Sequence, residues 1–225
     1  MSDHKNIENT DQEAVDKALG FWNAYGKKVS VAIAVIVVAV GGFWAYGNYV
    51  QAPKEVKANE DIFAAENYFR KDSFALALNG AAGVPGFLKI IDKHSGTKAA
   101  NLAHLYAGES YLQLGEFQKA IDQLNAFSSG GAKQIEAKVE GLIGDAYAEL
   151  KKNDEAIEHY KKAGNLFPDD QAISSEYLFR GALLSEIAGK NDQAIELYQV
   201  LKEKYPRTEK GFVVDKYLAR LGVTK

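Results

Sequence analysis

The sequence contains no cysteine among its 225 residues. This absence excludes disulfide bonds, thiolate metal sites and a cysteine nucleophile, and it is compatible with either an oxidising envelope compartment or the cytoplasm. The sequence also lacks an excess of charge of either sign, because beyond residue 50 it carries 23 basic and 25 acidic residues. Nucleic-acid binding would need a basic face, so nucleic acid is not a predicted partner.

Charged residues are also absent between Lys28 and Lys54. As a helix, this stretch would rise about 36 Å, enough to cross a hydrocarbon core of about 30 Å. Aromatic residues at both ends of the run suit the two headgroup belts of a bilayer; they are Trp22, Tyr25, Phe43, Trp44, Tyr46 and Tyr49. We therefore predict a transmembrane helix over residues 29–50, since a buried core helix or strand is usually half this length or less.

A cleaved signal peptide is an alternative reading of the same run. Ala45-Tyr46-Gly47 has small residues at the spacing of a cleavage site. However, the run exceeds the apolar segment of about 7–15 residues that signal peptides carry. This length favours an uncleaved anchor.

The lysines beside the run set its predicted orientation. Lys17, Lys27 and Lys28 precede the run, whereas Lys54 and Lys57 follow it within a comparable distance. Because positive charge favours the cytoplasmic side, this difference of one charge predicts a cytoplasmic tail over residues 1–28 and a domain across the membrane over residues 51–225. The tail either forms a short amphipathic helix on the membrane or is ordered only beside it.

Beyond Pro53, helical periodicity dominates and a residue pattern recurs with a period in the high thirties. The clear units are Asn101–Gln134, Ala137–Asp170 and Ser175–Thr208. Their small residues occupy equivalent positions, Gly108, Gly144 and Ala182 in the first half and Ala120, Ala156 and Ala194 in the second. We expect two helices per unit that approach closely at these positions, where a larger side chain would overpack.

The recurring residues resemble the tetratricopeptide repeat, a helix–turn–helix unit of 34 residues. We predict an all-α protein with one N-terminal transmembrane helix, a tetratricopeptide-repeat solenoid of about four repeats and a C-terminal capping helix. An atypical first unit is broken at Asn79–Gly86, which is too rich in glycine and proline to be helical. The capping helix is predicted to begin at Thr208, with Phe212, Val213, Tyr217, Leu218 and Leu221 on one stripe.

Residue patterns that carry catalysis are missing from the sequence. The histidines, at positions 4, 94, 104 and 159, form no pair at zinc-binding spacing. The glycine-rich stretches at 80–86 and 130–131 lack the strand and the lysine of a phosphate-binding loop. We therefore predict a protein that is not an enzyme, with no catalytic, metal or cofactor site and no small-molecule substrate.

In an array of this kind, the first helices of the repeats line a concave face. Mapping the repeat onto this face predicts candidate partner-binding residues: Phe69, Arg70, Leu105, Glu109, Leu112, Phe179, Leu183 and Ile187, with Ile62, Leu102, Asp145 and Glu149 beside them. Phe179, Leu183 and Ile187 are four residues apart and form one helical stripe. The stripe either packs as core or forms part of an apolar groove that suits an extended or helical peptide.

Three segments resemble a more particular family, namely Gly20-Phe21-Trp22 to Gly26-Lys27-Lys28, Phe69 to Ala77 and Gly86 to Ala100. Together with the order of tail, span and repeats, they resemble the YfgM-type ancillary subunits of the bacterial Sec translocon. The resemblance implies an inner-membrane anchor, repeats in the periplasm, and partners that include the secretion channel and a membrane-anchored prolyl isomerase or chaperone. It also implies assistance to polypeptides that emerge into the periplasm.

Two other classes of function remain open. One is a scaffold subunit of a different cell-envelope assembly or secretion complex. The other is a repeat domain that faces the cytoplasm, which follows if the orientation is the reverse of the one predicted.

Overall fold

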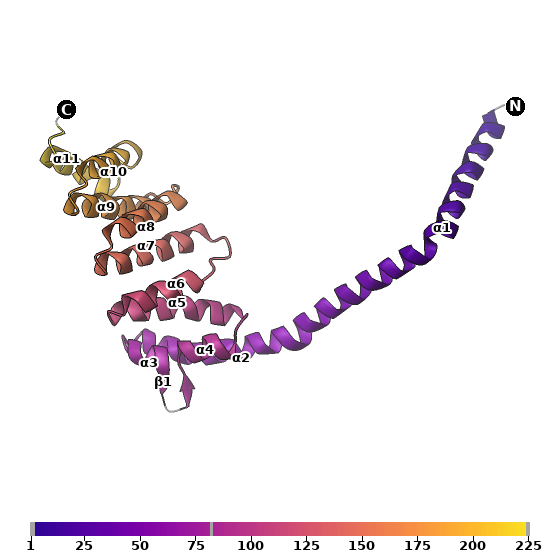
Figure 1. Ribbon diagram of the computed structural model, residues 1–225, viewed down its shortest axis with the longest axis horizontal. Helices are drawn as coiled ribbons and strands as arrows, with labels where there is room; N and C mark the ends of the chain where they lie inside the picture. The colour runs from indigo at the N-terminus through magenta and orange to yellow at the C-terminus, as the bar shows by residue number, and fades with distance from the viewer. Residues whose placement is uncertain (1–2, 82, 224–225) are drawn as a thin grey trace. The chain divides into compact units, whose positions relative to one another are not determined.

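The computed structural model describes residues 3–81 and 83–223, and the side chains of residues 3–14 and 18 lie outside the described part. The chain divides into two compact units, Met1–Pro53 and Lys54–Lys225 (Figure 1).

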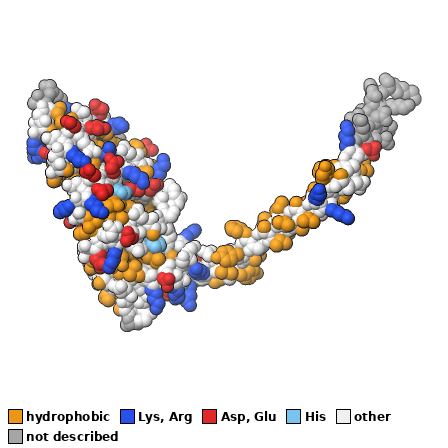
Figure 2. Space-filling view, viewed as in Figure 1, with side chains coloured by type: hydrophobic (Ala, Val, Ile, Leu, Met, Phe, Trp, Pro, Cys, Tyr) orange, Lys and Arg blue, Asp and Glu red, His pale blue; other side chains and the backbone are white. Residues whose placement is uncertain are grey.

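The first unit contains α1 (Asp3–Tyr46) and a five-residue π-helical segment, η1 (Gly47–Gln51). Because α1 runs through Lys28 without interruption, the described backbone of the predicted tail is helical up to the apolar run. Among the described residues, one helical stretch within Val15–Phe69 is long and apolar enough to cross a membrane, and none of its most apolar window is buried. Figure 2 shows hydrophobic side chains along this helix.

The second unit is a stack of helix pairs, which confirms the predicted helical solenoid (Figure 1). Its helices are α2 (Ala52–Phe69), α3 (Phe74–Asn79), α4 (Phe87–Lys93), α5 (Lys98–Gln113), α6 (Phe117–Ala126), α7 (Lys133–Glu149), α8 (Asn153–Leu166), α9 (Gln171–Ile187), α10 (Asn191–Lys204) and α11 (Glu209–Arg220). The three predicted repeats correspond to α5 with α6, α7 with α8, and α9 with α10. We call α2, α5, α7, α9 and α11 the A helices, and α6, α8 and α10 the B helices.

Small residues decide how closely the two helices of a repeat can pack. A Cβ atom built at Gly108 would lie 2.6 Å from the Leu124 side chain, and one at Gly144 would lie 2.8 Å from the Tyr160 ring. The alanines on the B helices, at positions 120, 156 and 194, are completely buried. The sequence-based expectation of close helix approach at these positions is therefore confirmed.

The first repeat differs from the others because two short helices, α3 and α4, stand in place of one B helix. Between them lies a small hairpin of β1 (Gly80–Ala81) and β2 (Val84–Pro85), in which Gly80 pairs with Pro85 and Ala81 with Val84. Gly80 has φ of 78°, and a Cβ atom there would lie 2.2 Å from the Val84 carbonyl oxygen. The sequence predicted the break in the helix but not the strand pairing, which depends on this tight backbone contact.

The capping helix begins where the sequence predicted, because the Thr208 hydroxyl accepts a hydrogen bond from the backbone N–H of Gly211 at 3.1 Å. Its predicted apolar stripe is correct in part, because Leu218 is buried and Tyr217 and Leu221 pack against the core of the last repeat. Val214 and Leu218 are buried, whereas Phe212 is 78% exposed and Val213 is 42% exposed. Three apolar residues follow one another here, so periodicity could not tell which one faces α10.

We predict that Ala156→Leu loosens the repeat array. Ala156 is completely buried at the helix crossing, and overpacking a core typically costs about 1–3 kcal/mol. Thermal unfolding of the purified full chain in mild detergent measures the effect. Ala126→Leu, at an exposed position of α6, is the matched control, and equal melting temperatures for the two variants would contradict the prediction.

Candidate functional site

Successive A helices contact one another along the stack, α5 with α7, α7 with α9, and α9 with α11. The side chains that these helices present together form what we call the A-helix surface. The candidate partner-binding residues lie on A helices, except for Arg70, which follows the last residue of α2: Phe69 on α2, Leu105, Glu109 and Leu112 on α5, and Phe179, Leu183 and Ile187 on α9.

These candidates differ in exposure. Leu105 and Phe179 are buried, with exposed fractions of 8% and 9%, whereas Ile187 is 71% exposed. Phe69, Glu109, Leu112 and Leu183 are half-buried, and Arg70 is exposed. Partner binding by these residues stays a prediction, but only the half-buried and exposed members can meet a partner without unpacking the core.

Phe179 belongs to an aromatic cluster inside the last repeat. Its ring lies 6.0 Å from that of Tyr198 and 5.1 Å from that of Tyr217 on the capping helix. The Lys210 ammonium lies 5.3 Å from the Phe179 ring centre. The stripe of Phe179, Leu183 and Ile187 therefore has two parts. Phe179 belongs to the core, whereas Ile187 lies on the accessible surface.

A second aromatic cluster lies at the start of the array. The Phe69 ring is 5.0 Å from Tyr106 and 5.5 Å from Phe74. Next to it, Arg70 forms an ion pair with Glu66 at 3.0 Å and lies 5.9 Å from the ring of Phe63. Phe63 is 59% exposed, so this end of the A-helix surface presents an aromatic ring and a guanidinium together.

Ion pairs join neighbouring A helices across the middle of the surface. Lys138 on α7 binds Glu109 on α5 at 2.6 Å, and Arg180 on α9 binds Asp145 on α7 at 2.9 Å. Lys210 on α11 binds Glu176 on α9 at 3.2 Å. The sequence-based prediction of the concave face included Glu109 and Asp145 but not their basic partners, because each partner lies about one repeat further along the chain.

Arg180 is the centre of the largest of these networks. Its guanidinium donates to both carboxylate oxygens of Asp145 and to Glu176 at 2.8 Å, while the Tyr160 hydroxyl donates to Asp145 at 2.7 Å. Burial, followed by the nearby Asp145 carboxylate, raises the pKa of the Tyr160 hydroxyl above its ordinary value. Tyr160 therefore stays protonated and acts as a hydrogen-bond donor to the network.

A different polar cluster joins α7 to α8. Glu140, only 8% exposed, lies 2.8 Å from His159 and 2.7 Å from Lys162. Burial acts to raise the pKa of the Glu140 carboxyl, but its hydrogen bonds with His159 and Lys162 outweigh burial and hold the pKa below its ordinary value. The carboxylate is thus a charged structural link between the two helices.

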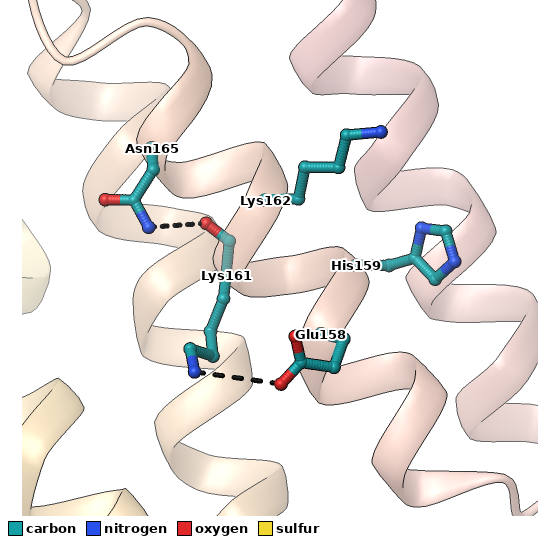
Figure 3. Close-up of a pocket in the computed structure, with 5 residues that line it drawn as sticks. All are labelled: Glu158, His159, Lys161, Lys162 and Asn165. Carbon is teal, nitrogen blue, oxygen red and sulfur yellow. Dashed lines mark hydrogen bonds and ion pairs between the residues drawn. The ribbon is translucent and has the colours of Figure 1, made fainter.

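A shallow hollow on α8 is lined by Glu158, His159, Lys161, Lys162 and Asn165. Figure 3 shows Lys161 near Glu158 and Asn165, whereas His159 and Lys162 point away from them. All five residues come from one helix, and the ones that face α7 are already engaged by Glu140. In the described parts of the chain, no group of three or more histidine, aspartate or glutamate residues could hold a metal ion.

Stacked helix pairs with an accessible A-helix surface define a helical-repeat protein of the class that binds other proteins. The family model of the tetratricopeptide repeat-like domain matches residues 20–136, just over half of the chain, and the model of the tetratricopeptide repeat matches residues 142–170 and 177–208. The chain belongs to the tetratricopeptide repeat-like family. A comparison with curated proteins finds no match to it.

The family assignment supports a role as a scaffold for protein–protein interaction, and its fold is typically non-catalytic. The matched region begins at Gly20 and therefore includes the apolar run as well as the first repeats.

We predict opposite behaviour at the two ends of the α9 stripe. Phe179→Ala should lower the free energy of unfolding by about 3–5 kcal/mol, because it removes a buried ring and leaves a cavity. Ile187→Ala should change it little, because Ile187 is mostly exposed. Denaturant unfolding of the two purified variants makes the comparison, and a large loss for Ile187→Ala would show that this side chain is packed.

Proposed function

We propose that the chain is a non-enzymatic, single-pass anchored scaffold of the bacterial inner membrane that binds partner proteins at the Sec translocon. In this proposal, residues 1–28 form the cytoplasmic tail, 29–50 the transmembrane helix and 51–225 the periplasmic repeat domain. The observation that carries it is the joining of an apolar helix to repeats within one matched family region. The lysine asymmetry around the span and the resemblance to YfgM-type subunits support the orientation and the location.

The proposed partners are Sec subunits and a membrane-anchored periplasmic prolyl isomerase or chaperone. The repeats would hold them, or an emerging polypeptide, through the accessible part of the A-helix surface. Its apolar members include Leu183, Ile187 and Phe69, beside ion pairs whose charges are already satisfied within the array. Such a surface suits a segment that brings apolar side chains and little charge of its own.

We predict that Leu183→Ser combined with Ile187→Ser weakens partner binding and lowers stability only modestly, because Leu183 packs partly against the core of the last repeat whereas Ile187 is mostly exposed. The substitutions remove accessible apolar area, at about 25 cal/mol per Å² of contact that would be buried. Photo-crosslinking in membranes, with a probe at the exposed Glu149, reports binding to Sec subunits and to secreted polypeptides, and a melting curve reports folding.

Leu76→Ser is the matched control, because Leu76 is also an exposed apolar residue but lies on α3, which is not an A helix. Loss of crosslinking in both variants, or in neither, would remove the support for the α9 end of the surface. Mild-detergent copurification with mass spectrometry tests the partner class. Recovery of an outer-membrane assembly or another secretion complex in place of Sec subunits would favour the alternative scaffold.

Cysteine labelling tests the proposed orientation of the span. Because the chain has no native cysteine, each introduced cysteine is the only site that can react. In cells with a permeabilised outer membrane, a membrane-impermeant maleimide should label Lys190→Cys but not Ser2→Cys. Both sites should react after detergent is added. Labelling of Ser2→Cys with protection of Lys190→Cys would place the repeats in the cytoplasm.

A further inference from the structure

The ion pairs between A helices share one direction along the chain. In each pair the carboxylate lies on the earlier helix and the cation on the next, and the pairs are Glu109–Lys138, Asp145–Arg180, Glu176–Lys210 and Glu186–Arg220. The step from α2 to α5 follows the same rule with a different donor. There the Glu55 carboxylate accepts hydrogen bonds from the backbone N–H groups of Lys98 and Ala99, at 2.9 and 3.1 Å.

Every junction between consecutive A helices therefore carries at least one contact from an acid to a positive group. The N-terminal N–H groups of α5 are such a group, because the helix dipole places partial positive charge there. Outside the A helices, Asp154 on α8 pairs with Lys190, the residue just before α10, and these two side chains are 71% and 40% exposed. The acids Glu109 and Glu186 are more enclosed, with 18% and 16% of their side chains exposed.

We propose that this series of contacts is an electrostatic latch that sets the curvature of the repeat array, so that the array opens when the contacts are screened. The apolar core continues from one repeat to the next, and a solenoid takes its shape from a small rotation repeated at every junction. The latch acts on the same side of each junction and pulls neighbouring A helices together. One half-exposed pair is weak. However, every contact acts on the rotation between two consecutive repeats, and these small rotations add up to the curvature of the whole array.

Screening gives the latch a dependence on ionic strength. The screening length falls from about 10 Å at 0.1 M salt to about 3 Å at 1 M. Half-exposed pairs such as Asp145–Arg180 should weaken over this range, whereas the apolar cores of the repeats should not. High salt should therefore straighten the array without unfolding it.

The test measures the distance between the two ends of the array in the full chain, reconstituted in lipid nanodiscs. Because the chain has no cysteine, Lys71→Cys and Lys216→Cys, both at exposed positions, carry a pair of spin labels for pulsed electron resonance. In the labelled parent, raising the salt from about 0.1 M to about 1 M should shift the distance distribution to longer values. An unchanged distribution over this range would overturn the proposal.

Variants separate the latch from general salt effects. Asp145→Asn with Glu176→Gln should lengthen the distance already at low salt and should reduce the salt response, while the Glu109–Lys138 and Glu186–Arg220 pairs remain. Asp154→Asn, which breaks the pair between α8 and Lys190 just before α10, is the matched control and should keep the distance and the response of the parent. An equal shift in the control, or a full salt response in the double variant, would contradict the latch.

Charge reversal at the junction of α5 and α7, which has one ion pair, tests the latch independently if the double variant does not fold. Glu109→Lys alone places two cations together and should lengthen the distance. Adding Lys138→Glu restores the pair in the opposite direction and should restore the parent distance. Failure of this restoration, with circular dichroism showing an intact helical array, would mean that packing and not the ion pair sets this junction.

Discussion

Close approach of the two helices in each repeat is the constraint on which the array depends. At Gly108 and Gly144 even one added carbon atom would collide with the partner helix. The alanines opposite them on the B helices are completely buried for the same reason. Because each helix pair is narrow at its crossing, the next pair can stack on it and continue one core through the array.

In this stack, the A helices contribute both buried side chains and charged surface side chains. Their buried members, such as Leu105 and Phe179, complete the packing, while charged residues on the same helices bind across junctions. Charges that are paired within the array make the surface nearly neutral without making it apolar. Accessible apolar side chains, Ile187 among them, lie beside these pairs, and we propose that they meet the partner.

Much of the fold could be predicted from the sequence. Recurrence of Ala120, Ala156 and Ala194 placed the B helices, and Thr208 marked the start of the capping helix. For the candidate surface, the sequence predicted which positions lie on the A helices but not which of their side chains are exposed. Phe179, Leu183 and Ile187 have the same spacing and similar hydrophobicity, yet one is buried and another is exposed, because Tyr217 of the capping helix covers Phe179.

The sequence by itself determined the helical class, the repeat period and an apolar run long enough to cross a membrane, since these depend on composition and on spacing within one or two helical turns. The tertiary structure alone decided which charges meet. Lys138, Arg180 and Arg220 find their acids 29, 35 and 34 residues away. No local pattern specifies such partners, because they are brought together only when one repeat is stacked on the next.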